Sequence, residues 1–292
     1  MGRNGGAQGV MHCLSIDVEG FVEGMLESFS IPDRCFDSSA EASEINVNVD
    51  ATLDLFDQLG IKGTFFILGR IAEWQRSTVK KIADGGHEIA SHSHFHRRIC
   101  NQTRATFSAE AAKAKKLLED ITGRQVLGFR APDFSIRSDT LWALDELHDA
   151  GYFYDASLTP TDIHDVYGNK GIPETIRRLD NGLYKFPAST FKMMGKTLTF
   201  GGGGYMRLYP IWFSRWLLWR ADRRSRSCML YMHPYEIGPR APRIDGISGY
   251  RRFRHYYNIE QGASRLRRVL RGFNFATAIS ILQSYSQSDR HE

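Results

Sequence analysis

Near its start the chain reads Val10-Met11-His12-Cys13-Leu14-Ser15-Ile16-Asp17-Val18-Glu19, an apolar run that ends in two acids. The run over 10–16 predicts a buried strand. Side chains alternate along a strand, so we expect Asp17 and Glu19 on the same face, with both carboxylates turned into one space. This strand therefore brings two acidic groups to one edge of a predicted sheet.

A second cluster further along the chain reads His92-Ser93-His94-Phe95-His96. His92 and His96 are four residues apart, so a single helical turn would aim both imidazoles at one point and His94 elsewhere. One carboxylate with two histidines is a common ligand set for a divalent metal that keeps a position open for water. The remaining carboxylate can serve as a base, so the two clusters predict a metal-assisted hydrolase.

Strand-like and helix-like segments alternate through most of the chain. Glycine closes several predicted helices, as at Gly60, Gly123 and Gly151, and a short apolar strand follows each time. The predicted strands are 10–16, 62–68, 87–91, 125–129, 152–155 and 229–232, and helices are predicted around 53–59, 74–82, 107–121, 141–150, 212–219 and, as the last, 261–271. This order indicates repeated βα units around a parallel sheet.

The chain is expected to form one domain. It has 292 residues, of which 42% are hydrophobic and 24% charged, and a single domain of this length favours an α/β barrel. We find no linker or internal repeat, so the domain is predicted over 11–285, between a flexible tail (1–10) and a polar tail (286–292). From about residue 181 the βα pattern loosens, and we expect this part to carry elements specific to the substrate.

The composition also bears on the compartment. Cys13, Cys35, Cys100 and Cys228 are scattered without a Cys-x-x-Cys pair, so they are expected to be reduced. No stretch reaches the roughly 20 apolar residues of a spanning helix, and the polar start lacks the apolar core of a secretory signal. A cytoplasmic location is the resulting expectation.

Further polar residues stand where predicted strands end, which is the reactive face of an α/β barrel. Arg130 and Asp133 lie in Gly128-Phe129-Arg130-Ala131-Pro132-Asp133, Asp155 ends the next strand, and His233 leaves a strand directly before Pro234. A proline holds the residue before it in an extended conformation. We therefore expect these four side chains on the same rim as the acids and the histidines.

The second half of the chain carries glycines, tryptophans and arginines in separate groups. The glycine run 201–204 lacks the lysine and hydroxyl residue that end a phosphate loop, so it is interpreted as a flexible loop on the substrate side, flanked by Tyr205 and Arg207. Trp212, Trp216 and Trp219 are expected in the core rather than on a sugar-stacking surface. No nucleic-acid motif accompanies the arginines, so no nucleic-acid partner is predicted. The basic stretch 212–226 is a candidate for peripheral membrane contact.

These motifs, in this order, resemble the polysaccharide deacetylases of the NodB-homology type, carbohydrate esterase family four. The chain looks most like the subfamily found beside exosortase and exopolysaccharide gene clusters. The matching pieces are Leu14-Ser15-Ile16-Asp17-Val18-Glu19, Gly63-Thr64-Phe65-Phe66-Ile67-Leu68-Gly69, Gly86-His87-Glu88-Ile89-Ala90-Ser91-His92 through His96, Gly128-Phe129-Arg130-Ala131-Pro132, Tyr154-Asp155-Ala156-Ser157, Gly202-Gly203-Gly204-Tyr205-Met206-Arg207 and Met232-His233-Pro234. The resemblance covers about residues 11–275 and implies a distorted (β/α)7 barrel.

The resemblance also implies roles for the residues at the strand ends. The metal ligands would be Glu19, His92 and His96; Asp17 would be the general base, Arg130 would hold that base, His233 would be the general acid, and Asp155 could keep His233 protonated. A backbone N–H after Pro132 is expected at the developing oxyanion. Substrate contacts are expected from Asp133, Gly204, Tyr205 and Arg207. Many relatives carry a second aspartate where this chain has Val18, so here the acid has moved one residue on, to Glu19.

The resemblance implies removal of acetyl from an N-acetylated amino sugar, in a polymer, an oligosaccharide or a carrier-linked precursor. The cofactor would be a divalent metal, most often Zn²⁺, although two imidazoles and a carboxylate also accept Co²⁺, Ni²⁺ or Mn²⁺. Two other hypotheses remain open: a deformylase or amidase acting on a related N-acyl substrate, and a catalytically silent glycan-binding protein. The sequence does not fix the oligomeric state.

Overall fold

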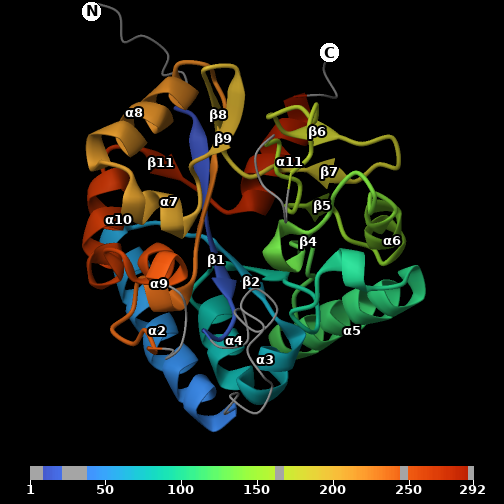
Figure 1. Ribbon diagram of the computed structural model, residues 1–292. Helices are drawn as coiled ribbons and strands as arrows, with labels where there is room; N and C mark the ends of the chain where they lie inside the picture. Colours follow the sequence, from blue (N-terminus) through green and yellow to red (C-terminus); the bar gives the residue numbers. More distant parts are fainter. Residues whose placement is uncertain (1–8, 22–37, 162–167, 244–248, 289–292) are drawn as a thin grey trace, which may run out of the picture.

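A parallel sheet curled into a distorted barrel forms the centre of the molecule (Figure 1). The computed structural model describes residues 9–21, 38–161, 168–243 and 249–288. The strand order is β10-β1-β2-β3-β4-β5-β7-β6, with β11 paired to β1, and all pairs are parallel except β6 with β7. The strands are β1 (Met11–Val18), β2 (Thr64–Ile67), β3 (Glu88–Ser91), β4 (Gly128–Phe129), β5 (Tyr154–Asp155), β6 (Arg177–Arg178), β7 (Tyr184–Lys185), β10 (Met229–Met232) and β11 (Asn274–Phe275).

Loop segments close the gap between β10 and the opposite end of the curled sheet. The amide of Met229 in β10 donates to Oγ of Ser189 at 2.8 Å, and the amide of Tyr231 donates to the carbonyl of Gly201 at 2.8 Å. Ser189 lies just before β8 (Thr190–Met193), which forms a separate antiparallel hairpin with β9 (Lys196–Thr199). The expected βα barrel is therefore confirmed, with its ring completed by bonds to loop atoms instead of a regular strand.

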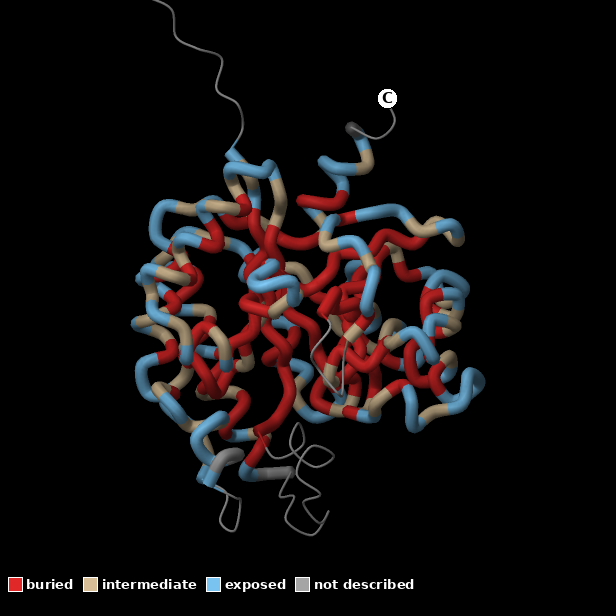
Figure 2. The backbone as a smooth tube through the Cα atoms, turned by 45° about the horizontal axis from the view of Figure 1, so that its top comes forward, coloured by how far each residue is buried: buried red, intermediate tan, exposed pale blue. Residues whose placement is uncertain are grey.

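Alternation along β1 divides the core into two parts. Leu14, Ile16 and Val18 pack with the helices that surround the barrel. Cys13 packs with the interior residues Phe66, Ala90, Tyr154 and Met229, and Asp17 lies on the same face as Cys13. Figure 2 shows the central strands β1 to β5 and β10 largely buried, with most of the exposed chain in the surrounding helices and loops. The interior face of β1 therefore places the side chains of Ser15 and Asp17 inside the barrel.

Helices cover the outside of the barrel at the places the sequence predicts, with different bounds. The segment predicted as one helix around 74–82 forms two, because the chain turns at Gln75, where ψ is +42°. The helices are α2 (Ser38–Leu59), α3 (Gly69–Trp74), α4 (Arg76–Asp84), α5 (Arg104–Thr122), α6 (Ala143–Asp149), α7 (Gly203–Leu208), α8 (Ile211–Asp222), α9 (Gly249–Tyr256), α10 (Gly262–Leu270) and α11 (Ala278–Ser288).

The prediction that the helix at 261–271 is the last is wrong, because α11 follows it. Ala278, Ile281 and Leu282 of α11 pack into the barrel interior. At the start of the helix the amide of Ile279 donates to Oε2 of Glu88 at 3.0 Å, and a carboxylate is favourable at this end of a helix. The helix includes 286–288, which were predicted as polar tail. Residues 289–292 and, of the predicted N-terminal tail, 1–8 lie outside the described residues.

The tryptophans of α8 are not in the core. Trp212, Trp216 and Trp219 are 71%, 41% and 52% exposed, while Leu217 and Leu218 of the same helix are buried. The prediction failed because tryptophan at spacings of four and three fits a buried stripe, yet leucine and alanine on the opposite side fill that role here. An exposed row of tryptophans calls for an explanation other than folding.

Two expectations from composition can be compared with the described residues. Cys13, Cys100 and Cys228 are free thiols, as expected for a reduced chain, whereas Cys35 lies outside the described segments. Among the helices that the structure describes, none combines the length and apolar character needed to cross a bilayer.

A buried histidine makes the fold sensitive to acid. His87 lies against the rings of Phe56 and Phe65, and its Nδ1 accepts the amide of Gly63 at 3.2 Å. Burial, with the nearby charge of Lys62, lowers its pKa from 6.5 to about 4. Between these values the unfolded chain binds a proton that the folded chain does not, so stability falls as the pH drops. We expect a loss on the order of 2 kcal/mol by pH 4.

Urea unfolding at a series of pH values would measure this loss. His87→Asn removes the titrating group and keeps an oxygen near the position of Nδ1 as an acceptor for Gly63. We expect the variant to be less stable at neutral pH and to lose less stability on acidification. Equal pH dependence in both proteins would contradict the assignment.

Candidate metal and acid–base site

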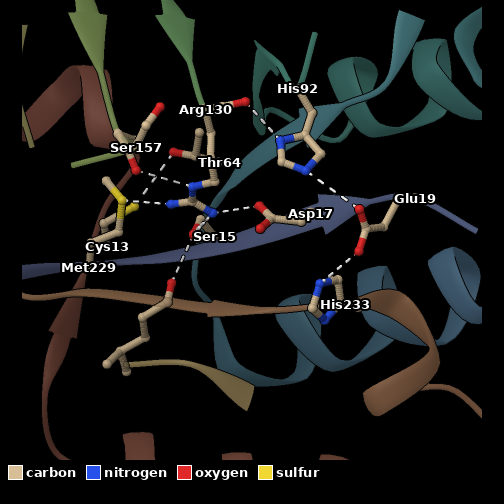
Figure 3. A network of polar contacts seen from close by, with 12 residues as sticks. Cys13, Ser15, Asp17, Glu19, Thr64, His92, Arg130, Ser157, Met229 and His233 are labelled. Carbon is tan, nitrogen blue, oxygen red and sulfur yellow. Dashed lines mark hydrogen bonds and ion pairs between the residues drawn. The ribbon is translucent and has the colours of Figure 1, made fainter. Parts of the chain in front are cut away.

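The polar residues predicted from the strand ends do meet at one edge of the barrel (Figure 3). Asp17 lies in β1 and Glu19 directly follows that strand, while His92 comes directly after β3. Arg130 follows β4, and His233 follows β10. Because β10 pairs with β1 in parallel, His233 lies beside the two acids although more than 200 residues separate them. Figure 3 shows the Glu19 carboxylate between His92 and His233.

Glu19, His92 and His96 form a compact group of donor atoms. One ligand atom from each lies within 4.8 Å of the others, and all three side chains are buried. The Oε2 atom of Glu19 is 2.7 Å from Nε2 of His96 and 3.5 Å from Nε2 of His92. Nδ1 of His92 lies 2.9 Å from the carbonyl oxygen of Arg130. That bond places the proton on Nδ1, which leaves the Nε2 lone pair directed at the group. The donors therefore fit a divalent cation.

The acid in this group remains ionised. Burial raises the pKa of Glu19, but the charges of His96 and His233 and the hydrogen bond from His233 outweigh burial and hold that pKa well below its usual value. An ionised carboxylate with two imidazoles is the form that binds zinc and its neighbours.

The histidines reach this group without the helical turn that their spacing predicts. Ser93 has φ of +67°, which lies outside the α-helical region, and residues 92–98 form a loop. The carbonyls of Ser93 and His94 accept the amides of Gly69 and Arg70, both at 2.9 Å, so α3 holds the loop in place. His94 turns away, with Nε2 2.8 Å from Nζ of Lys113. His92 and His96 do lie close together, as their spacing predicted, but a loop held by α3 brings them together instead of a helical turn.

Asp17 pairs with Arg130 at the base of the site. Nη1 of Arg130 donates to Oδ1 of Asp17 at 2.5 Å and to Oγ of Ser15 at 2.9 Å. Arg130 is fully buried and its guanidinium carbon lies 4.0 Å from the centre of the Phe66 ring, while Asp17 is 2% exposed. The arrangement fixes the carboxylate of Asp17 in one orientation.

His233 is held by a residue to which the sequence assigned no role. Nδ1 of His233 lies 3.0 Å from Oε2 of Glu236, and Nε2 lies 2.9 Å from Oε1 of Glu19. Burial lowers the pKa of His233, but the charge of Glu19 and hydrogen bonds to Glu19 and Glu236 outweigh burial and raise that pKa well above its usual value. Burial also raises the pKa of Glu236, yet Arg207 and His233 lower it to about 2. His233 is therefore protonated, and its side chain is 20% exposed.

Asp155 does not hold His233. Its Oδ1 accepts the hydroxyl of Ser157 at 2.5 Å, and its Oδ2 accepts the amide of Ser157 at 3.0 Å. Burial raises the pKa of Asp155 to about 6. The signal for Glu236 was present in His233-Pro234-Tyr235-Glu236, because proline followed by an acid two positions later marks the first turn of a helix. That turn brings the Glu236 carboxylate back to His233.

Two of the residues expected to contact substrate, Arg207 and Asp133, have charged partners within the protein. The predicted flexible loop of the glycine run is partly the helix α7, and Arg207 in it is buried. Nε of Arg207 donates to Oε1 of Glu236 at 2.9 Å, so Arg207 supports the acid–base pair. Asp133 binds Nε of Arg98 at 2.6 Å on the rim. Gly204, Tyr205 and Arg207 line a cavity beside His233.

Gly262 of α10 packs closely against the backbone of Glu236. A Cβ on Gly262 would overlap the backbone carbonyl oxygen of Glu236, whereas a Cβ on Gly204 meets nothing within 4 Å. Gly262→Ala is therefore expected to lower the free energy of unfolding by about 2 kcal/mol. Gly204→Ala, on exposed helix, serves as the control and should be neutral or slightly stabilising. Urea unfolding of both variants checks this. Because alanine is intrinsically the better helix former, a stabilised Gly262→Ala protein would refute the close contact.

A βα barrel with a candidate metal centre at the carboxyl ends of its strands defines the class of protein. Within that class, residues 34–152 match the family model described as polysaccharide deacetylase, and residues 156–283 match a model described as a domain of unknown function, DUF3473. Over residues 34–152 the chain is therefore similar to the polysaccharide deacetylase family, as its motifs predicted.

Curated relatives agree with this assignment. A peptidoglycan deacetylase-like protein of Gibberella zeae is 33% identical over 182 residues, which are 61% of this chain and 51% of the relative. A peptidoglycan deacetylase of Helicobacter pylori is 28% identical over 167 residues, 56% of this chain and 55% of the relative. The chain thus spans about half the length of the curated relatives it matches.

Solved structures support the fold. A crystal structure of a Mycobacterium smegmatis protein, named as a candidate polysaccharide deacetylase, superposes with a TM-score of 0.65. The sequences are 19% identical, and the match covers 98% of this chain and 93% of that one. This likeness extends across both matched segments, so the two family models describe parts of one barrel.

Proposed function

We propose that this protein is a hydrolase that removes the N-acetyl group from an amino sugar in a glycan or a glycan precursor. The observation that carries the proposal is the meeting of three elements at one strand edge: the Glu19, His92 and His96 donors, the Asp17–Arg130 pair, and the His233–Glu236 pair. The names of the curated relatives, which are peptidoglycan deacetylases or proteins like them, support an N-acetylated sugar as substrate. Placement in the exopolysaccharide subfamily and in the cytoplasm stay predictions.

Glu19, His92 and His96 would hold the cofactor. A divalent cation bound there, with Zn²⁺ the first choice and Co²⁺, Ni²⁺ or Mn²⁺ acceptable, would polarise the acetamide carbonyl and supply a water of lowered pKa. The mixed nitrogen and oxygen donors favour these ions over Mg²⁺ or Ca²⁺, which prefer oxygen ligands.

The acid–base work falls to two pairs of side chains. Asp17, oriented by Arg130, accepts the proton of the attacking water as the new C–O bond forms. His233, protonated and supported by Glu236, donates a proton to the amide nitrogen as the C–N bond breaks, so that the sugar leaves as a neutral amine. The reaction needs one group that accepts a proton and one that donates a proton. Asp17 and His233 on the same rim can fill these two roles.

A cavity beside His233 is the candidate sugar site. It has a volume of about 430 Å³ and is bordered by α7, β10 and α9. Its aromatic lining residues are Tyr205, Tyr231, Tyr235, Phe253 and Tyr257. Sugar rings present C–H groups on one face that pack on aromatic side chains, and the adjoining polar groups can bind hydroxyls. The DUF3473 segment supplies all of these residues.

Metal content and acetate release measured on the same samples test the proposal. The purified protein is stripped with a chelator, reloaded with zinc and incubated with N-acetylglucosamine oligomers. We expect acetate only from the loaded protein. His96→Gln should lose both zinc and activity, whereas His94→Gln, in the same loop but turned to Lys113, should keep its zinc.

Three results would count against the proposal in different ways. Failure to bind zinc would overturn the metal centre. Zinc binding with release of formate, or of an amine from a non-sugar amide, would replace the acetyl sugar by another substrate. Zinc binding and glycan binding without any hydrolysis would indicate a silent glycan-binding protein.

A further inference from the structure

The tryptophan face of α8, defined as Trp212, Trp216 and Trp219, lies outside the core and outside the candidate active site. The three residues follow one another at spacings of four and three, so they form a single stripe along the helix. That stripe points away from the buried side of α8, where Leu217, Leu218 and Ala221 lie. Exposing three tryptophans is costly in water, and such surfaces usually mark an interaction site.

The rings of this face are poorly placed for sugar stacking. The guanidinium carbon of Arg220 lies 5.4 Å from the centre of the Trp216 ring, and that of Arg223 lies 5.5 Å from the Trp219 ring. The Phe213 ring stacks on Trp216 at 5.7 Å with an interplanar angle of 17°. A sugar needs an open ring face, and arginine or phenylalanine covers faces of two of these rings. Tryptophan edges beside arginines instead suit a lipid interface.

The tip of the β8–β9 hairpin presents a second exposed apolar group. Met194 is 94% exposed and has φ of +51°, and Gly195 after it has φ of +76°. Two successive positive φ values define a type I′ turn, whose first position favours asparagine. Neither the turn geometry nor packing favours methionine here. A methionine at an unfavourable and 94% exposed position is consistent with an external apolar partner.

The hairpin and α8 border one basic cavity. It has a volume of about 860 Å³, and its charged lining residues are Lys170, Glu174, Lys192, Arg220, Arg224 and Arg226. Its one acid, Glu174, is bound by Arg226 at 2.7 Å, with Lys192 at 3.8 Å. The acid of α8, Asp222, lies 3.0 Å from His12. The basic residues at this surface outnumber Glu174 and Asp222, so an excess of positive charge remains.

We propose that the tryptophan face and the Met194 hairpin bind the surface of a membrane that contains anionic phospholipids. The tryptophans and Met194 enter the interfacial region, and the surrounding arginines and lysines contact lipid phosphates. The same charge argues against a second copy of the chain, because two positive surfaces would repel each other. The chain as a whole carries a formal charge of +5, which adds long-range attraction to an anionic membrane.

This surface lies away from the candidate active site. Nη2 of Arg226 donates to the carbonyl of Thr190 at 2.6 Å. The first residue of the hairpin therefore lies beside the segment that precedes β10. His233 leaves the opposite end of that strand. Figure 1 shows the hairpin and α8 together at one end of the barrel. Membrane binding and hydrolysis of a soluble oligomer can therefore be measured independently.

Co-sedimentation with lipid vesicles tests the proposal. The full chain is mixed with vesicles of phosphatidylcholine alone or of phosphatidylcholine with phosphatidylglycerol, at low and high salt. We expect pelleting with the anionic vesicles, weakened by salt. Arg223→Gln with Arg224→Gln should lower the partition coefficient by about fivefold for each arginine removed. Trp212→Ser with Trp219→Ser should lower it by about tenfold or more.

Met194→Asn is the sharpest variant, because asparagine suits the turn better than methionine does. We expect it to keep or raise the melting temperature and yet bind anionic vesicles several-fold more weakly. The matched control is Trp74→Ser, since Trp74 is 39% exposed and lies near Arg70, but on α3 beyond the active-site end of β2. Its vesicle binding should equal that of the unchanged protein.

Several results would overturn the proposal. These are no pelleting with anionic vesicles, equal pelleting with both vesicle types, or pelleting that Met194→Asn and the tryptophan variants leave unchanged. A tryptophan variant that loses binding to an insoluble glycan, or changes oligomeric state on gel filtration, while vesicle binding persists would assign the face to a glycan or to a second copy.

Discussion

Asp17→Asn is expected to lower the rate of acetate release by about a thousandfold while the protein keeps its zinc. Asparagine has the size of aspartate and still offers an oxygen to Arg130, but it cannot accept the proton of the attacking water. The donor group consists of Glu19, His92 and His96, and Asp17 is not part of it. Steady-state rates on N-acetylglucosamine oligomers, with zinc determined in the same samples, measure both expectations.

The control for this variant is Asp133→Asn. Asp133 is also an aspartate of the rim, but its carboxylate is bound to Arg98 at 2.6 Å. We expect only a small change in rate, because a partly exposed ion pair contributes little. If Asp17→Asn instead loses its zinc, Asp17 is a ligand. If the rate is unchanged, another group is the base.

Arg130→Met is expected to lower the free energy of unfolding by about 3–5 kcal/mol. Arg130 is fully buried, and its removal leaves the Asp17 carboxylate buried without its charged partner. Methionine is the closest apolar match in length and can pack on Phe66, so the loss reflects mainly the unpaired charge. Urea unfolding measures the loss, with circular dichroism to verify that the fold is retained.

A double-mutant cycle separates charge from packing in this case. Asp17→Asn with Arg130→Met removes both charges, so a large part of the stability should return, although activity should not. Additive losses in the double variant would show that the pair is not coupled, and the orientation of Asp17 would then need another explanation.

The parts of the site that the sequence predicted follow from strand periodicity. Asp17 lies with Cys13 on the interior face of β1, as alternation requires, and His233 leaves β10 beside it because parallel strands end at one edge. Such contacts depend only on the direction of the strands, and a few apolar residues are enough to identify a strand in the sequence. They were predictable without knowledge of any side-chain conformation.

The parts that the sequence missed depend on tertiary contacts of single side chains. Asp155 and Glu236 are both acids near a strand end, and only the turn after Pro234 decides which one reaches His233. Arg207, expected as a substrate contact, lines the cavity beside His233, but the Glu236 carboxylate also binds it from another segment. The clamped loop at Ser93 replaces a helical turn because amides of α3 bind its carbonyls. Apart from the turn after Pro234, no local pattern encodes these choices.

The pairing of β1 with β10 has a consequence for biosynthesis. β1 emerges from the ribosome before β10, so one of its edges stays unpaired until β10 has been synthesised. In the folded chain Oγ of Ser15 donates to the carbonyl of Leu230, 215 residues later. Until then the nascent chain carries an unpaired, largely apolar strand edge of the kind that draws chains into aggregates. A transcript truncated before Met229 would yield a product that lacks His233 and keeps this edge open, and such a product would be a substrate for chaperones and proteases.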